Sequence, residues 1–399
     1  MTEDTSQPRP EGQADPAAQA SAQTSAEIAA EHPPKPARVV WIASEETLDY
    51  LGRTLQPLAI GLIDEMVEVT AVCPDESAAG DLPCPPIDII RRGPIRWWLP
   101  HAKVVEALAD ELTTRRVQVL HALDAPAADL TRRLASELDA WYIVSSYAMG
   151  DGKRLGTLDG RCAGVLAPSE PIRRDLLEHH VAAADKIRLV HPGVHQVRHT
   201  TLFDNPQQST AIVAGGRLED AKAFEAVLKC FAEIKAHGHD CAFFIIGGGR
   251  AEMSLRRQAD KLGLREALAF VEHQPPTQLA GIFKAADIYI SPAPLRQFDM
   301  HALLAMAAGD PVIAAGGGCS DFLIDGQTAL LFKSGDAAEL TVKLTSLLDD
   351  HAAARALAEN SLDFLRENYS PAAMVHSLAA MYRQVAQQAT AGDRAPALA

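Results

Sequence analysis

Short apolar segments alternate with helical segments along most of this 399-residue chain, and that alternation limits its fold more than any other feature. The apolar segments are rich in β-branched residues and nearly continuous, as strands are when both faces of a parallel sheet are covered. A first series of expected strands covers residues 39–43, 67–72, 87–91, 117–121, 141–145, 164–167 and 187–190. A second series covers residues 211–214, 242–246, 268–271, 287–291, 311–314 and 329–332. The pattern predicts an α/β protein with two doubly wound parallel sheets, each in a Rossmann-like domain.

The clearest expected helix runs from about residue 221 to residue 237. Asp220 can cap its start, and Gly238 can end it. Its apolar residues recur at helical spacing, which predicts one buried face. They are Phe224, Val227, Leu228, Phe231 and Ile234.

Changes in composition divide the chain into five parts. Residues 1–36 hold six prolines, no aromatic residue and six acidic against two basic side chains, so they cannot bury enough apolar surface to offset the entropy of ordering. We expect disordered tails at 1–36 and 389–399. A polar run that follows a His-Pro-Gly sequence separates one domain at 37–199 from another at 200–370. A final helix at 371–388 has an apolar face that needs a surface to pack on.

The charge balance and the cysteines exclude several classes of function. The chain has 37 Lys and Arg against 52 Asp and Glu, a net charge of −15, so nothing in it favours nucleic acid as a partner. Its six cysteines form no CxxC pair and its 14 histidines no HExxH motif, so we expect no disulfide framework and no metal site. No apolar run approaches the roughly 18 residues of a membrane-spanning helix, and the N-terminal segment lacks the apolar core of a secretory signal. We therefore expect a cytoplasmic protein.

Motifs that suit an anionic ligand lie in the second half. A strand runs into Gly215-Gly216-Arg217-Leu218, and Lys222 follows in the first turn of a helix. Glycines at a strand end let a ligand approach the backbone, and Arg and Lys can neutralise a diphosphate. A tight turn with two surface cations would have the same sequence. The next strand opens onto Gly247-Gly248-Gly249, which suits a phosphate or a sugar.

Taken in order, the segments of the second half resemble the family-4 (group 1) glycosyltransferases of the GT-B fold. They are GRL followed by a lysine, IIGGG at 245–249, ADIYISP at 286–292, AMAAGDPVIAAGGG at 305–318 and DGQTALLF at 325–332. The resemblance is strong over 210–335 and weak over 37–150. It implies a GT-B fold, with two Rossmann-like domains facing across a cleft and the last helix crossing back to the first domain.

The resemblance implies an enzyme of carbohydrate biosynthesis, a hexosyltransferase that moves a sugar from a nucleotide-diphosphate sugar to an acceptor. The transfer would retain the anomeric configuration and need no metal and no cofactor. Arg217 and Lys222 would stabilise the diphosphate leaving group. The other donor-side residues would be Gly215, Gly216, Gly247, Gly248, Gly249, His273, Ser291, Arg296, Phe298 and Asp299. The acceptor, whether a glycan, a lipid-linked or a small molecule, would lie near His121, Asp124 and Tyr147.

Two positions depart from the family signature, which is a Glu, seven residues and a second Glu before the AMAAG segment. Arg296 and Leu304 stand at those positions. Two interpretations follow. In one, the chain is a transferase that binds its donor differently, with Arg296 as a third cation near the diphosphate or facing an acidic sugar. In the other, it is a catalytically silent relative that binds a nucleotide, a glycan or a partner transferase.

One segment, Arg91–Trp98, is both basic and aromatic. Such a segment can contact an anionic acceptor or a membrane surface, which predicts peripheral binding at the inner membrane face. The alternative is a turn followed by a helix whose Trp97 and Trp98 pack inward.

Overall fold

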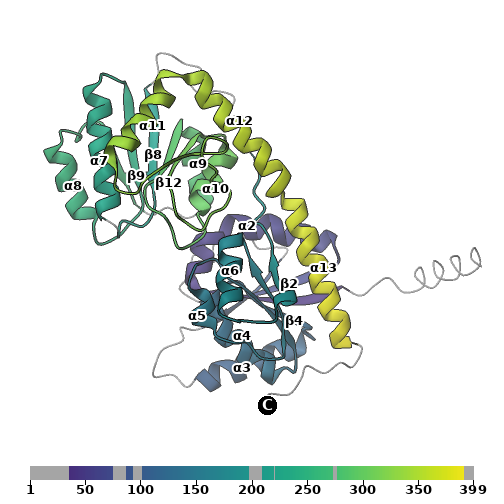
Figure 1. Ribbon diagram of the computed structural model, residues 1–399. Coiled ribbons are helices and arrows are strands. Elements are labelled where there is room, and N and C mark those ends of the chain that lie inside the picture. Colours follow the sequence, from purple (N-terminus) through teal and green to yellow (C-terminus); the bar gives the residue numbers. More distant parts are fainter. Residues whose placement is uncertain are drawn as a thin grey trace, which may run out of the picture. The chain divides into compact units, whose positions relative to one another are not determined.

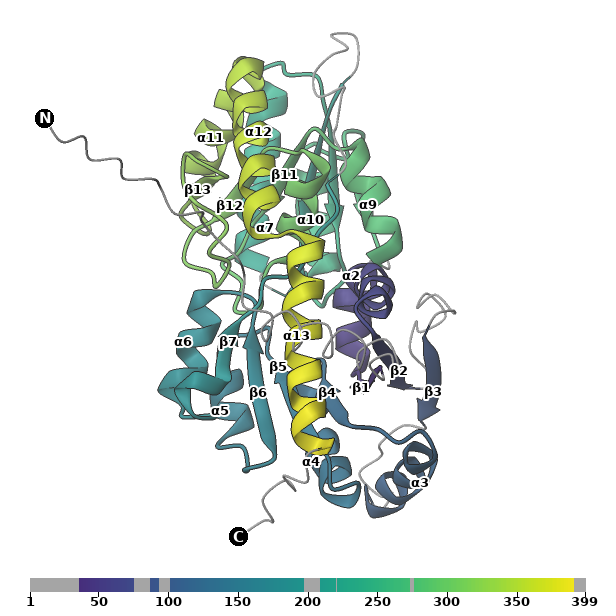
Figure 2. The same cartoon turned by 90° about the vertical axis from the view of Figure 1, so that its right-hand side faces the viewer.

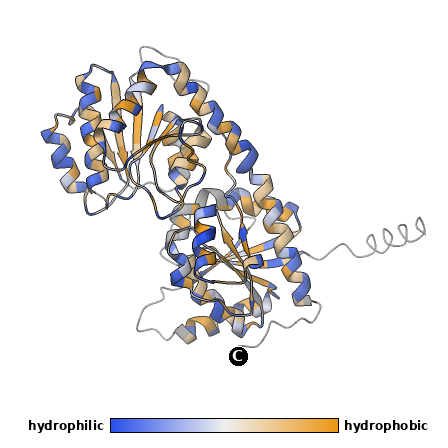
Figure 3. Ribbon diagram, in the orientation of Figure 1, coloured by the Kyte–Doolittle hydropathy of each residue, from blue (hydrophilic) through white to orange (hydrophobic). Residues whose placement is uncertain are grey.

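The computed structural model describes residues 36–74, 87–92, 101–196, 209–219, 221–272 and 276–390. Residues from Ala37 onward belong to one unit. Within the described part of that unit lie two parallel sheets, one of seven strands and one of six (Figure 1). The strands of both sheets are mostly apolar, as Figure 3 shows in orange, because helices cover their faces.

The first sheet has the strand order β3-β2-β1-β4-β5-β6-β7, and its strands pair in parallel. Its strands are β1 (Ala37–Ile42), β2 (Val67–Pro74), β3 (Asp88–Arg92), β4 (Val119–Ala122), β5 (Trp141–Ser145), β6 (Cys162–Ala167) and β7 (Ile187–Leu189). The α-helices between them are α2 (Glu45–Asp64), α3 (His101–Thr114), α4 (Ala128–Glu137), α5 (Asp151–Leu155) and α6 (Glu170–Glu178). Two short 3₁₀ helices are η2 (Ala125–Ala127) and η3 (Ala184–Lys186).

The second sheet has the order β10-β9-β8-β11-β12-β13. Its strands are β8 (Thr210–Gly215), β9 (Cys241–Ile246), β10 (Leu268–Val271), β11 (Ile288–Ser291), β12 (Val312–Ala315) and β13 (Leu330–Phe332). Its helices are α7 (Ala221–Ala236), α8 (Glu252–Lys261), α9 (Pro276–Ala285), α10 (Met300–Ala308), α11 (Ala337–Asp349) and α12 (His351–Asn368). In both sheets the strand order reverses beside the first strand, at β1/β4 and at β8/β11. Such reversals are where doubly wound folds bind ligands, outside the carboxyl ends of the strands.

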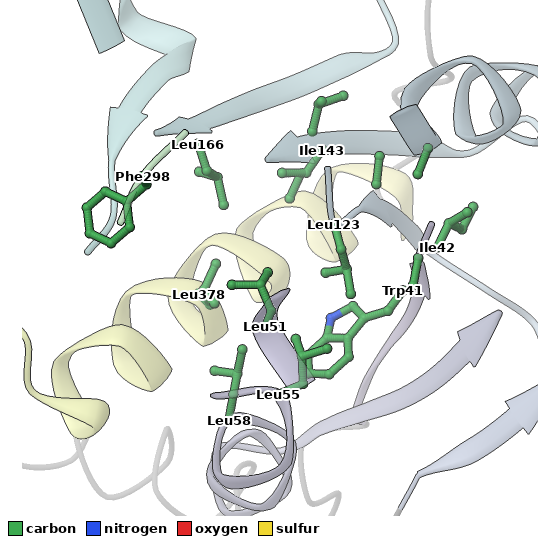
Figure 4. Packing of buried hydrophobic residues seen from close by; sticks show 14 of the residues in the cluster. Trp41, Ile42, Leu51, Leu55, Leu58, Leu123, Ile143, Leu166, Phe298 and Leu378 are labelled. Atoms are coloured by element: carbon green, nitrogen blue, oxygen red, sulfur yellow. The ribbon is translucent and has the colours of Figure 1, made fainter. Parts of the chain in front are cut away.

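The last helix, α13 (Pro371–Thr390), packs on the first domain, where it contacts α2, β1 and β4 (Figure 2). Its Arg383 donates to the carbonyl and the carboxylate of Glu65, both at 2.7 Å. Figure 4 shows Leu378 of α13 near Leu51 and Leu58 of α2. This packing explains why the apolar face of the helix is buried.

One apolar core extends from the first sheet into part of the second domain. It includes Leu55 of α2 together with Leu279 and Phe283 of α9, and α2 contacts α9 directly. A smaller core lies between the second sheet and α7, α8 and α11. The two domains therefore share apolar packing in addition to the covalent link.

The predicted fold class is confirmed. Each expected strand overlaps an observed one, and the expected helix at 221–237 is α7, followed by Gly238 with a φ of 86°. Asp220 lies outside the described residues, as do the predicted tails except for Pro36 and residues 389–390. The tail predicted from 389 begins too early, because α13 runs to Thr390, and the Gln and Ala residues before that point favour a helix.

Candidate functional site

Two glycine loops leave adjacent strands at the carboxyl edge of the second sheet and pack backbone against backbone. The Leu218 N–H donates to the Gly248 carbonyl over 3.1 Å. A Cβ on Gly247 would lie 2.0 Å from the Gly216 oxygen, and one on Gly249 would lie 2.6 Å from the Leu218 oxygen. Neighbouring backbone thus requires glycine at 247 and 249. Gly248 is exposed, and a Cβ there would meet nothing within 4 Å, so it is the glycine open to a ligand.

Two exposed cations flank these loops. Arg217 follows the first loop, and Lys222 lies in the first turn of α7, with its stem against Gly335. Across the described ranges, neither side chain forms an ion pair or a hydrogen bond. Gly215 is the last residue of β8, and a Cβ there would lie 2.8 Å from the Tyr289 hydroxyl. Glycine at 215 therefore leaves room for the buried Tyr289 side chain. Arg217 and Lys222 are therefore available to an anion.

Ser291 and Asp299 are buried and hold the start of α10. The Ser291 hydroxyl donates to the Asp299 carboxylate over 2.5 Å, and the other carboxylate oxygen accepts the Ala302 N–H at 2.9 Å. The Asp299 N–H donates to the Ser320 hydroxyl at 2.8 Å. The start of α10 therefore carries an N-cap carboxylate of its own, with 3% of Asp299 exposed.

Phe298, predicted on the donor side, has no exposed surface. Its ring centroid lies 5.3 Å from that of Phe322 and 6.5 Å from that of Tyr369, at the end of α12. The structure thus places Phe298 in an aromatic cluster and offers none of its side chain to a ligand.

The loop that contains Arg296 pairs with the segment that follows β5 in the first domain. Met149 N–H donates to the Arg296 carbonyl at 2.7 Å, and Phe298 N–H donates to the Tyr147 carbonyl at 2.8 Å. The Arg296 guanidinium donates to the Met149 carbonyl at 3.1 Å and lies beside Gly150. The exposed Arg296 therefore sits where the two domains meet.

Further contacts join the domains nearby. The Ser169 hydroxyl donates to the Cys319 carbonyl at 2.6 Å, and the Glu170 N–H donates to the Asp321 carboxylate at 2.7 Å. Leu304, at the second departure from the family signature, is half-buried and packs against the larger apolar core.

A cavity of about 120 Å³ lies at the carboxyl edge of the first sheet. Its polar lining includes Thr47, Asp124, Tyr147, Asp151, Arg154 and, from the second domain, Gln297. Asp124 caps η2 through the Ala127 N–H at 2.9 Å and accepts from the hydroxyls of Ser44 and Thr47. Burial raises the pKa of Asp151, against hydrogen bonds from the Ser146 hydroxyl and the Ala148 N–H. The cavity thus combines two carboxylates, a phenol and a guanidinium.

His121 is 2% exposed. Its ring nitrogens lie 2.5 Å from the Tyr382 hydroxyl and 2.9 Å from the Ser145 hydroxyl. Burial lowers the pKa of His121 to about 3, so the ring is neutral near pH 7. The ring is buried beside a small cavity of about 20 Å³, which it lines together with Ser145, Tyr147 and Tyr382.

Sequence reasoning did not assign Asp151 and Arg154 to the cavity. The Gly150–Arg154 segment was the available signal, since it follows a strand and combines glycines with charge. It forms the start of the short helix α5, which brings both side chains to the cavity. Of the predicted site residues, His273 lies outside the described part. In the predicted membrane-contact segment, Arg91 and Arg92 end β3, and residues 93–98 lie outside the described part.

Two features are absent from the described residues. No group of three or more His, Cys, Asp or Glu in that part of the chain could hold a metal ion. No described helix is long and apolar enough to cross a membrane.

The glycine loops and the two cations lie in a segment that a family model matches. Residues 203–363 match the model of the group 1 glycosyl transferases. The D-inositol 3-phosphate glycosyltransferase of Corynebacterium aurimucosum is 29% identical over 52% of this chain and 54% of its own length. That of Mycobacterium marinum is 31% identical over 55% of this chain and 50% of its own. The chain thus aligns with about half the length of these curated relatives.

Solved structures match over most of the chain. A glycosyltransferase from Rickettsia africae has a TM-score of 0.73 at 15% identity, covering 88% of this chain and 99% of its own. Anabaena Alr3699/HepE in complex with UDP and glucose has a TM-score of 0.71 at 14% identity, covering 87% of this chain and 100% of its own. At such identities the likeness shows the fold, and that fold is GT-B.

Proposed function

We propose that the chain is a family-4 glycosyltransferase that transfers a sugar from a nucleotide-diphosphate sugar to a hydroxyl-bearing acceptor. One observation carries the proposal. Arg217 and Lys222 are exposed and unpaired among the described residues, beside two glycine loops whose packing fixes the backbone. The match to group 1 glycosyl transferases over residues 203–363 supports the donor assignment, because it covers these loops.

The two cations would act on the leaving group. Breaking the bond between the sugar and the diphosphate leaves negative charge on the phosphate oxygens, and Arg and Lys placed there stabilise it. A hydrogen bond to a charged group contributes about 1.5–3 kcal/mol, so each cation has a measurable share. In the proposed transfer this stabilisation takes the place of a metal ion, and the resemblance to family-4 glycosyltransferases implies that the anomeric configuration is retained.

The acceptor would occupy the cavity lined by Asp124, Tyr147, Asp151 and Arg154. Carboxylates accept hydrogen bonds from hydroxyls, and guanidinium and phenol groups donate to ring or hydroxyl oxygens. The set suits a glycan, a lipid-linked sugar or a small polyol. For Arg296 we propose a place beside the donor sugar, since it lies at the junction of the domains.

The second candidate function is binding without transfer, to a nucleotide, a glycan or a partner transferase. Two observations favour it. The half-buried Leu304 packs against the apolar core where the family carries a Glu. The Asp299 carboxylate already caps the start of α10, where it would repel a phosphate.

We also propose a cytoplasmic location with contact to the inner membrane face through residues 91–98. Sedimentation with anionic liposomes tests the contact. Binding that is lost in Arg96→Glu supports it, and the absence of binding contradicts it.

The function itself is tested by a thermal-shift panel of UDP, GDP and ADP and of their sugars, followed by product detection with the best donor. A ligand of the native state raises the melting temperature by mass action. A shift with one nucleotide, together with donor hydrolysis or transfer, supports the enzyme. A shift without turnover supports the binding protein, and no shift with any member contradicts both nucleotide proposals.

A further inference from the structure

A buried chain of hydrogen bonds runs from the last helix to the acceptor cavity. The Trp41 indole N–H donates to the Tyr382 hydroxyl at 3.1 Å, and that hydroxyl lies 2.5 Å from Nδ1 of His121. Nε2 of His121 lies 2.9 Å from the Ser145 hydroxyl, which hydrogen bonds to the Tyr147 hydroxyl. Tyr147 lines the acceptor cavity, so this series of hydrogen bonds connects α13 to the cavity.

The direction of each hydrogen bond follows from what each group can donate. An indole N–H only donates, so the Tyr382 oxygen accepts from Trp41 and its own proton is left for another acceptor. Among the described residues, Nδ1 of His121 is the only other group hydrogen bonded to this hydroxyl. Trp41, Tyr382 and His121 are at most 2% exposed, so bulk solvent does not compete for the Tyr382 proton, although His121 and Tyr382 line a small cavity of about 20 Å³.

A neutral imidazole carries one N–H. If Nδ1 accepts from Tyr382, the proton of His121 must lie on Nε2, where it donates to the Ser145 oxygen. The Ser145 hydroxyl then turns its own proton toward Tyr147. The opposite tautomer would leave the Tyr382 proton without an acceptor among the residues that the structure describes, and an unsatisfied buried donor costs free energy.

We infer that Tyr382 is a positioning residue for Tyr147: it selects the Nε2–H tautomer of His121, and through Ser145 it sets the orientation of the Tyr147 hydroxyl at the acceptor cavity. His121 and Tyr382 are 261 residues apart in the sequence. In this inference α13 orients a side chain of the first domain in addition to packing on it. The role of Tyr147 toward an acceptor rests on the proposed function. The order of the hydrogen bonds does not.

The tautomer is measured by long-range ¹H–¹⁵N correlation on the full chain labelled at histidine. Near pH 5, where exposed histidines are protonated, His121 should remain neutral, with a protonated Nε2 and a bare Nδ1. Tyr382→Phe removes the donor and should bring a population with the proton on Nδ1. Tyr289→Phe is the matched control, since the Tyr289 hydroxyl is also buried but has no hydrogen-bond partner in the described structure. It should leave His121 unchanged.

The effect on the cavity is followed through the ¹³Cζ signals of the six tyrosines, which single substitutions assign. Tyr382→Phe and Ser145→Ala should both shift the Tyr147 signal, whereas Tyr289→Phe should not. If Tyr382→Phe fails to fold, Ser145→Ala and the wild-type tautomer still decide the matter.

Three results would overturn the inference. They are a wild-type His121 protonated on Nδ1, a tautomer that Tyr382→Phe leaves unchanged, and a Tyr147 signal that does not respond to Ser145→Ala. None of these depends on a nucleotide. If the protein binds no nucleotide-sugar but gives the expected spectra, the transferase proposal is refuted and the inferred order of hydrogen bonds is still supported.

Discussion

Replacing Asp310 by Asn should change how the stability of the protein depends on pH. Asp310 directly precedes Pro311 and β12 and has no exposed surface. Neither of its carboxylate oxygens has a hydrogen-bond partner in the described structure. Burial, with a smaller contribution from Asp287, holds the pKa of Asp310 well above its usual range. The folded chain therefore keeps this carboxyl protonated at pH values where the unfolded chain ionises it.

The size of the effect follows from proton linkage. Between the unfolded pKa of about 3.9 and the raised folded pKa, the native state binds one more proton than the unfolded state. The contribution of Asp310 is thus fully present below the unfolded pKa. As the pH rises toward the folded pKa, it is lost at about 1.4 kcal/mol per pH unit. Asp310→Asn removes this slope.

Urea unfolding from about pH 4 to about pH 8 measures the difference between wild type and variant. At the acid end the two free energies of unfolding should differ by a constant, and the variant should gain on the wild type as the pH rises. Asp260→Asn is the control: Asp260 is exposed, and its hydrogen bond to Arg265 lowers its pKa, so that variant should not gain with rising pH. If the free energies of unfolding of wild type and Asp310→Asn change in parallel with pH, the conclusion that Asp310 is buried in its protonated form is wrong.

Three other substitutions and one chemical probe give independent tests. Gly247→Ala should lower the free energy of unfolding in urea by about 1–3 kcal/mol, because Gly247 has a φ of 137° and a Cβ there would lie 2.0 Å from the Gly216 oxygen. The free energy of unfolding of Gly248→Ala should stay within about 0.5 kcal/mol of the wild-type value. Equal losses would contradict the loop packing. Tyr289→Phe should be neutral or stabilising in thermal unfolding, since its hydroxyl is unsatisfied; a large loss would reveal a missed partner. Burial raises the pKa of Cys162 and Cys230 to about 12, so a thiol reagent near pH 8 should label them only after unfolding, and rapid native labelling would contradict their burial.

The sheets could be predicted because burial on both faces makes each strand nearly continuous in apolar residues. Once the strands are placed, the part of the site that directly follows a strand end could be predicted as well. The glycines after β8 and β9 meet because parallel strands end at one edge, so Arg217 is placed by its position in the chain.

Side-chain partners distant in sequence could not be predicted. Nothing near His121 indicates that Tyr382, 261 residues later, covers it. Likewise Phe298 has no exposed surface because Phe322 and Tyr369 lie against it, and Asp299 faces inward because Ser291 and the start of α10 bind its carboxylate. The family resemblance transfers positions along the chain but not these partners.

Calorimetric titration with the nucleoside diphosphate that gives the largest thermal shift tests the central claim most directly. The wild type is compared with Arg217→Ala, Lys222→Ala and, as a control, Lys229→Ala, an exposed lysine two turns further along α7. Loss of one charge-assisted contact of about 1.5–3 kcal/mol weakens binding by roughly 10- to 100-fold. We predict that loss for Arg217→Ala and for Lys222→Ala, with Lys229→Ala unchanged. Unchanged affinity in both site variants would contradict the donor site.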